Sequence, residues 1–377
     1  MHTCGYGDHC LLVTKTEDSN QMWVLILCNS IGSPIDTKNI NIEPLYACMN
    51  KTHIFIASND SVYVWQYRSQ VSKLLSQETS KRKIGREMGF NIDESPDLNA
   101  LYDPERFMKA ARASQDPISC ITAGDGFFIV GRASGTLQKY TIPHVALECK
   151  YILRCRPKLI GINCNASKFS IIDINGVLTF YDTLAKSTGN SLGEHLEIKR
   201  KDVWDMKWST DNPELIAIME KTRMFVLNGS ESEEPVISSG YLCEFKDLEI
   251  KAVLLDEVFK SPDLHAPPEE LIIKFETKSL KETRELVSKV DVKEAYTHVE
   301  KNPNPRLWKI VAEAALYKID LDIAQKAFVK VDDYQGLMFI GKLKKLEDPM
   351  KQKAEIAVFF KNYDEAEEII SQLTAKI

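Results

Sequence analysis

The sequence predicts a multidomain β + α protein, with strands over residues 1–278 and helices over residues 279–377. Three observations lead to this prediction. Short apolar strands and tight turns repeat with a period near 41 residues, which is the spacing of Gly135 and Gly176. The strand pattern stops after "ELIIKFETK", and apolar residues then recur with the 3.6-residue period of a helix. A helical segment near the C-terminal end repeats after 42 residues.

The strand region repeats one pattern of three short strands and two turns, in which the third strand ends in an aromatic residue. Its copies read "PLYACMNKTHIFIASNDSVYVWQY", "PISCITAGDGFFIVGRASGTLQKY", "PKLIGINCNASKFSIIDINGVLTFY" and "DVWDMKWSTDNPELIAIMEKTRMFVL". Ser-Gly and Asn-Gly pairs stand where hairpin turns need positive φ, and we expect the terminal aromatic residues in the core. A period of roughly 40 to 45 residues with four short strands is typical of β-propeller blades, which bury their faces against one another.

The number of repeats is low for a complete ring of seven blades. "CLLVTKTEDSNQMWVLILCN" reads as part of an earlier blade and "GYLCEFKDLEIKAVLLDE" as part of the closing one, which makes five or six. We therefore expect a partial, degenerate WD-type propeller, with the chain beginning inside it. The dipeptide Trp204-Asp205 falls in the first strand of its unit rather than at the end of the third, so we do not read it as a WD motif.

An insertion separates the first two of these copies, because their spacing exceeds the period by about 30 residues. It runs from Arg68 to Gln115 and contains "SKRKIGRE" and "NIDESPDLNALYDPERF". We expect a solvated, partly disordered loop over 68–115. A basic docking site for an acidic partner or for anionic lipid is the alternative.

Composition and charge narrow the class of protein. With 377 residues, 44% hydrophobic, the chain is long enough for two domains with cores of their own. A net charge of -6 provides no basic field for a phosphate backbone, so we expect protein partners and no nucleic acid. The longest apolar run, "MWVLILC", is too short to cross a bilayer, and no signal peptide is visible. We expect a cytoplasmic protein.

The nine cysteines include no C-x-x-C pair and mostly lie in strand-like stretches such as "ISCIT" and "GINCN". We expect reduced, buried thiols. His2, Cys4, His9 and Cys10 fit no established zinc spacing, so no metal site is predicted there.

The helical region begins with "DVKEAYTHVEK", where Asp291 as N-cap and Glu294 form a capping-box pattern. "NPNP" ends that helix because proline lacks the amide donor. The next two helices form a hairpin, and each has one apolar face: Trp308, Val311, Ala312, Ala315 and Leu316 on the first, and Ile323, Ala324, Ala327, Phe328 and Val331 on the second.

This hairpin recurs without a gap, since "AEAALYKIDLDIAQKAF" aligns with "AEIAVFFKNYDEAEEII". Alanines at the crossing points let paired helices approach closely. The pattern predicts a tetratricopeptide-like α-solenoid with a long repeat. Ile370, Leu373 and Ile377 are left without a covering repeat, from which we expect a natural protein that continues further.

No catalytic signature accompanies these repeats. G-x-x-x-x-G-K-[ST], G-x-G-x-x-G, H-E-x-x-H and G-x-S-x-G are all absent. "GRASG" reads as a hairpin turn, and His144, His195, His265 and His298 stand in polar contexts without paired carboxylates. We predict a non-enzymatic protein with no catalytic, cofactor or metal residues, and we assign no binding residues.

Four long phrases resemble one known family. "DVWDMKWSTDNPELIAIMEKTRMFVLN", "GYLCEFKDLEIKAVLLDEV", "NPNPRLWKIVAEAAL" and "AFVKVDDYQGLMFIGKL" are similar to the WD-repeat subunit of intraflagellar transport complex A, which carries two propellers and a tetratricopeptide-like solenoid. The resemblance is specific from about Asp116 onward and would place the chain over the second propeller and the start of the solenoid.

The resemblance implies a scaffold subunit for retrograde ciliary transport, cilium assembly and entry of membrane-protein cargo. It implies as partners the other subunits of complex A and that cargo, with a peripheral membrane contact left open, and as locations the ciliary base or basal body and the axoneme. A vesicle-coat subunit of the coatomer type has the same propeller-and-solenoid plan and is the alternative.

Overall fold

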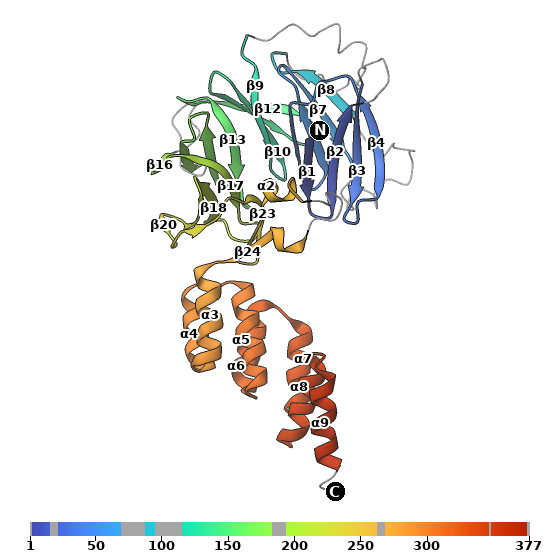
Figure 1. The fold of residues 1–377 in the computed structure, drawn as a ribbon, viewed down its shortest axis with the longest axis vertical. Coiled ribbons are helices and arrows are strands. Elements are labelled where there is room, and N and C mark those ends of the chain that lie inside the picture. Colours follow the sequence, from blue (N-terminus) through green and yellow to red (C-terminus); the bar gives the residue numbers. More distant parts are fainter. Residues whose placement is uncertain are drawn as a thin grey trace. The chain divides into compact units, whose positions relative to one another are not determined.

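The computed structural model describes residues 2–15, 22–68, 87–94, 115–182, 194–261, 268–346 and 348–374. The chain folds as two compact units (Figure 1). Unit 1 comprises residues 1–230 and 236–239, and unit 2 comprises residues 231–235 and 240–377.

Unit 1 consists of antiparallel sheets of consecutive strands, each formed by one stretch of sequence. The first two sheets are β1 (His2–Tyr6), β2 (His9–Lys15), β3 (Trp23–Asn29) and β4 (Pro34–Ile40), then β5 (Tyr46–Met49), β6 (His53–Ala57), β7 (Ser61–Gln66) and β8 (Glu87–Asn91). The next two are β9 (Ile118–Ala123), β10 (Phe127–Arg132), β11 (Thr136–Thr141) and β12 (Ala146–Ile152), then β13 (Pro157–Ile162), β14 (Lys168–Asp173), β15 (Leu178–Asp182) and β16 (Glu194–Arg200). The fifth contains β17 (Val203–Trp208), β18 (Leu215–Glu220) and β19 (Arg223–Asn228), with β21 (Val236–Ile237) paired to β19.

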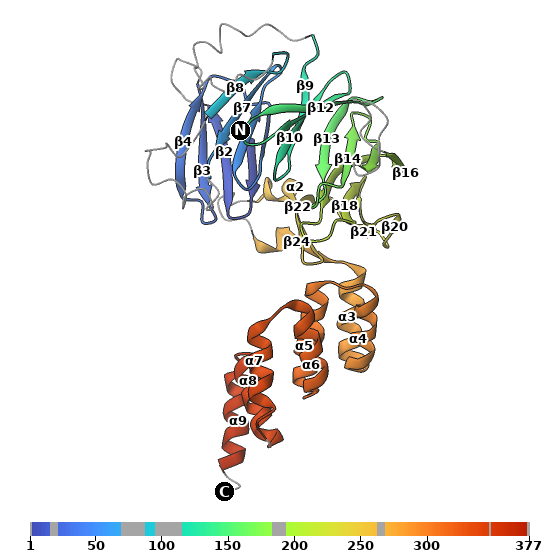
Figure 2. The ribbon, with the colours of Figure 1, turned by 180° about the vertical axis from the view of Figure 1, so that it is seen from behind.

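The first strands of these sheets lie next to one another in sequence order, from β1 through β5, β9 and β13 to β17. Figure 2 shows the same succession of sheets from behind. This is the arrangement of propeller blades, in which a sheet packs face to face against the sheets before and after it.

Alternation along the second strand of a blade explains this packing. In β6, Ile54 and Ile56 belong to the apolar cluster shared with the first sheet, whereas Phe55 and Ala57 belong to the cluster shared with the third. All five residues of β6 are buried. Because successive side chains of a strand point to opposite faces, a strand with neighbours on both faces needs a continuous apolar run, and "IFIA" supplies it.

Unit 2 begins with the short strand β20 (Glu231–Ser232) and a three-stranded sheet of β22 (Tyr241–Lys246), β23 (Glu249–Val253) and β24 (Ile272–Glu276). The short helices α2 (Leu255–Val258) and η2 (Glu269–Leu271) lie between β23 and β24 in the sequence. Six sheets therefore precede the long helices in the described part of the chain, and the predicted fold class is confirmed. The change from strand to helix falls between Glu276 and Lys278.

The rest of unit 2 is helical, with α3 (Lys278–Lys289), α4 (Val292–Lys301), α5 (Pro305–Tyr317), α6 (Leu321–Val331), α7 (Tyr334–Leu343), α8 (Pro349–Phe359) and α9 (Tyr363–Thr374). The predicted hairpin is α5 and α6, and its repeat is α8 and α9. The whole predicted face of α5 is buried, as are Ala324, Ala327 and Phe328 on α6, while Ile323 and Val331 are half-buried. Gly336 of α7 lies so close to the Phe328 ring that any side chain there would collide with it.

The turn predictions are confirmed. Gly135 and Gly176 have φ of 93° and 74°, and the Cβ of any other residue at Gly135 would clash with two carbonyl oxygens. Of the terminal aromatic residues expected in the core, Tyr140 is buried, whereas Tyr67 and Tyr181 are half-buried; Trp65 and Phe180, in the third strands beside them, are buried. Trp204 lies in β17, the first strand of its sheet, as expected, and its indole donates a hydrogen bond to the Lys221 carbonyl.

Three expectations need correction. The loop predicted over 68–115 contains β8, whose Val62↔Phe90 pairing makes it the fourth strand of the second sheet; the remainder of that prediction, 69–86 and 95–114, lies outside the described residues. Of the nine cysteines expected to be buried, only Cys28 and Cys120 are. Cys164 and Cys243 are exposed, Cys164 because it falls just after β13 ends, and the other five are partly exposed. Asp291 is the N-cap of α4 but forms no side-chain capping bond, so the predicted capping box is wrong.

Candidate protein interface

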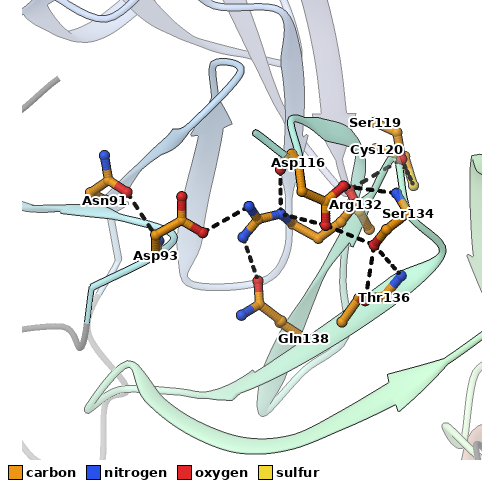
Figure 3. Close-up of polar contacts among 10 residues, drawn as sticks. Asn91, Asp93, Asp116, Ser119, Cys120, Arg132, Ser134, Thr136 and Gln138 are labelled. Carbon is orange, nitrogen blue, oxygen red and sulfur yellow. Dashed lines mark hydrogen bonds and ion pairs between the residues drawn. The ribbon is translucent and has the colours of Figure 1, made fainter. Parts of the chain in front are cut away.

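Arg132 is the charged centre of a polar network at one end of the second and third sheets (Figure 3). It is the last residue of β10, and its side chain is only 6% exposed. The guanidinium donates from Nη2 to the Asp93 carboxylate at 2.8 Å and from Nε to the Asp116 carbonyl at 2.6 Å. The Asp116 carboxylate lies 3.5 Å from Nε, and Gln138 accepts from Nη1 at 3.5 Å.

This network joins two points that are distant in sequence. Asp93 lies just beyond β8, and Asp116 lies just before β9. Asp116 also accepts hydrogen bonds from the backbone amide of Ser134 at 2.8 Å and from its hydroxyl at 2.7 Å. A guanidinium has five donors in a fixed fork, so a single arginine can hold both carboxylate-bearing segments at once.

Backbone hydrogen bonds hold the same two segments. The Ile92 amide donates to the Asp60 carbonyl at 2.8 Å, and the Ile118 amide donates to the Asn59 carbonyl at 2.7 Å. Both acceptors lie in the turn between β6 and β7. The two described segments on either side of residues 95–114 are therefore fixed against the same turn.

The chemistry of the network is structural. Burial raises the pKa of the Cys120 thiol to about 12, so it carries no thiolate at neutral pH. The neighbouring Ser119 hydroxyl donates to the Gly131 carbonyl at 3.2 Å. The hydrogen bonds of the network hold the segments at Asp93 and Asp116 against β10.

A second set of polar contacts recurs at the opposite ends of the blades, in the turns after the first strands. Asn50 Nδ2 donates to the Gly124 carbonyl of the next sheet at 2.7 Å, and Lys51 pairs with Asp125 there at 2.6 Å. Two sheets further on, the Asn163 amide donates to the Pro213 carbonyl at 3.1 Å, and Lys168 pairs with Glu214. In each set, one neutral hydrogen bond and one ion pair link consecutive sheets.

The residues considered as possible sites in the sequence analysis have structural positions or lie apart from one another. His144 is exposed in the turn after β11, and "GRASG" forms the turn between β10 and β11, as predicted. Within the described residues, no three His, Cys, Asp or Glu side chains form a group that could hold a metal ion. No described helix has the length and apolar character needed to cross a bilayer.

The sequence analysis did not single out Arg132. An arginine at the end of the apolar strand "FFIVGR" nevertheless indicates a charge whose partners must come from other segments.

Comparison with known proteins assigns the chain to a family. Residues 1–276 match the family model described as the WDR35 second beta-propeller, and residues 307–376 match the IFT80/172/WDR35/WDR19 TPR domain. The chain belongs to the WD repeat-containing protein 35 family. This confirms the family resemblance inferred from the sequence, with a second-propeller region followed by tetratricopeptide-like repeats.

Curated relatives agree over nearly the whole chain. WD repeat-containing protein 35 of Rattus norvegicus is 47% identical over 376 residues, which cover 97% of this chain and 31% of that protein. The Homo sapiens protein of the same name is 46% identical over 387 residues, covering 97% and 32%. The chain thus spans about a third of the length of these relatives.

Solved structures show a more distant likeness. The β-propeller domain of Cps50 (Swd1) from Myceliophteria thermophila has a TM-score of 0.45 at 12% identity, covering 67% of this chain and 79% of that one. Hsv2p of Kluyveromyces lactis has a TM-score of 0.40 at 9% identity, covering 66% and 74%. Values this low carry no functional inference.

Proposed function

We propose that the protein is a non-enzymatic scaffold subunit of the intraflagellar transport A complex, acting in retrograde ciliary transport, cilium assembly and the entry of membrane-protein cargo. The observation that supports this most strongly is the match of both parts of the chain, propeller and helical repeats, to the WD repeat-containing protein 35 family. Its partners are the other subunits of that complex and ciliary membrane proteins. Its locations are the cytoplasm, the ciliary base or basal body and the axoneme.

The geometry supports binding rather than catalysis. The polar groups around Arg132 are engaged with one another, and the Cys120 thiol beside them has a strongly raised pKa. Helical repeats such as α5–α6 and α8–α9 stack into extended surfaces whose usual role is to hold other chains. Nothing in the described residues positively indicates turnover of a substrate.

The experiment that tests this proposal is depletion and rescue in ciliated cells of the source organism. Depletion should leave short cilia in which transport particles accumulate at the tip and membrane proteins fail to enter, and re-expression should restore both. Normal cilia combined with a block in vesicle traffic would instead support the coatomer-type alternative and overturn the ciliary assignment.

A further inference from the structure

A surface of unexpectedly positive charge lies on unit 1 of this acidic protein. From Cys149 to Ile172 the chain contains five Lys or Arg residues and no Asp or Glu, although its net charge is -6. A second cluster, "IKRK", ends at Lys201. Charge segregated in this way produces a local field that the net charge conceals.

Hydrogen bonds place these two stretches on one continuous edge. The Leu153 amide donates to the Gly135 carbonyl at 2.9 Å, and the Ile174 amide donates to the Arg156 carbonyl at 3.2 Å. Further along, the Val203 amide donates to the Gly176 carbonyl at 2.9 Å. The loops that connect the third, fourth and fifth sheets therefore run side by side with the turns of those sheets.

We name this edge the basic rim, and it is defined by the exposed side chains of Arg154, Arg156, Lys158, Lys199, Lys201 and Arg223. None of these six forms an ion pair within the described part of the chain. The nearby acids are already engaged: Glu220 pairs with Arg200, and Asp202 pairs with Lys221. Asp173 is buried and accepts from the Asn175 and Val177 amides, both at 2.8 Å. The rim thus carries uncompensated cations.

Two aliphatic side chains stand among these cations. Ile174, at the tip of the turn between β14 and β15, is 57% exposed, and Ile152, at the end of β12, is 69% exposed. The amide of Ile174 is bonded to the Arg156 carbonyl, so the first isoleucine lies beside an arginine of the rim. Exposed aliphatic groups flanked by charge suit a ligand that has apolar as well as acidic groups.

We propose that the basic rim binds an acidic polypeptide segment that also carries aliphatic side chains. The guanidinium of an arginine can donate two parallel hydrogen bonds to one carboxylate, and the isoleucines supply apolar contact for residues between the acidic ones. A polypeptide fits better than an anionic membrane, because acidic groups lie at the same end of the blades. The Glu94 side chain is exposed just beyond β8, and the neighbouring Asp93 side chain is 52% exposed. A planar anionic surface would meet these acids, whereas a narrow chain follows only the rim.

The test uses the purified chain and a fluorescein-labelled peptide rich in Asp and Glu that contains leucines. Fluorescence anisotropy should show binding that weakens as the salt concentration rises from about 50 to about 300 mM. Over this range the Debye length shortens, so the attraction between exposed charges is screened. The triple variant Arg154→Glu, Arg156→Glu, Lys158→Glu should raise the Kd by about tenfold or more, because reversed charges repel the same carboxylates. The control Lys330→Glu, Lys345→Glu, Lys353→Glu makes the same charge change on exposed helical residues and should leave the Kd within about twofold.

Circular dichroism first has to show that both variants are folded. Each outcome of the binding assay then supports or contradicts the proposal. Equal loss of binding in both variants would show that the effect comes from net charge alone and would contradict peptide binding at the basic rim. Absence of peptide binding, with phosphatidylserine vesicles bound instead, would overturn the polypeptide occupant in favour of a membrane. The inference is independent of membership in a transport complex, since the peptide assay involves no other subunit.

Discussion

Ile319 and Lys361, 42 positions apart, adopt the same left-handed backbone conformation, with φ of 59° and 61°. Each stands in the turn that ends the first helix of a hairpin, α5 or α8. The bonds around them also match: the Asp320 amide donates to the Ala315 carbonyl at 2.8 Å, and the Asn362 amide donates to the Ala357 carbonyl at 2.9 Å. The repeat therefore extends to the strained residue of the turn and shows that the two hairpins are one structural unit used twice.

Lys361→Gly should stabilise the chain. Glycine adopts positive φ without the steric strain of a side chain, and Lys361 is exposed, so its loss removes little packing. We expect the free energy of unfolding of the helical unit to rise by about 0.5–1 kcal/mol in urea titrations. The matched control is Lys353→Gly in the middle of α8, where the same change should cost about 1 kcal/mol. A destabilising Lys361→Gly would contradict the role of the left-handed turn.

Arg132→Met should destabilise unit 1 strongly. The change keeps an unbranched apolar chain in place of the arginine stem but removes the cation that contacts Asp93 and Asp116, which costs about 2–4 kcal/mol of unfolding free energy in denaturant titrations. Lys51→Met is the control, because its ion pair with Asp125 is exposed on both sides and should be worth at most about 1 kcal/mol. Equal effects of the two changes would mean that the buried network is not what holds this end of the blades.

Stability should depend on pH through His53. This side chain is 5% exposed on β6, and burial lowers the pKa of its imidazole from 6.5 to about 4. Between these values the unfolded chain binds a proton that the folded chain does not, so the stabilisation is complete above pH 6.5 and is lost as the pH falls through that window toward 4. The loss amounts to about 3 kcal/mol at most.

Urea titrations at several pH values check this dependence. His53→Gln should remove the slope between pH 6.5 and 4, whereas His144→Gln, at an exposed site, should keep it. An unchanged slope in the His53 variant would show that another group is responsible for the acid sensitivity.

Ala315→Arg should unfold the α5–α6 hairpin. Ala315 is fully buried where the two helices cross, and a guanidinium there has neither space nor a partner, which costs more than about 3 kcal/mol. Far-ultraviolet circular dichroism should show lost helicity. Val329→Arg on the exposed face of α6 introduces the same group and should leave helicity unchanged. Wild-type helicity in the Ala315 variant would contradict the close crossing of these helices.

Periodicity explains which features the sequence predicts well. Blades and hairpins each bury alternating or helical faces, so Phe55 on β6 and Ala315 on α5 can be placed in the core from spacing alone. β8 was missed because residues 69–86 separate it from its partner strand, too many for a hairpin turn. The alternation of Met88, Phe90 and Ile92 was nevertheless a usable signal, since all three are buried.

The polar sites could not be predicted in this way. Arg132 meets Asp93 and Asp116 only because three segments converge, and no short spacing records that convergence. Cys164 reads as buried in "GINCN", yet β13 ends at Ile162 and leaves it exposed. Burial at the last residues of a strand depends on where the neighbouring sheet ends, which the local sequence does not specify.

The most direct test of the scaffold account is affinity capture of the tagged protein from ciliated cells, with the bound proteins identified by mass spectrometry. We expect the other subunits of the intraflagellar transport A complex among the captured proteins, and weaker recovery of them with Ala315→Arg than with Val329→Arg. Recovery of vesicle-coat subunits in their place, or of no transport subunit by the wild-type protein, would contradict the account.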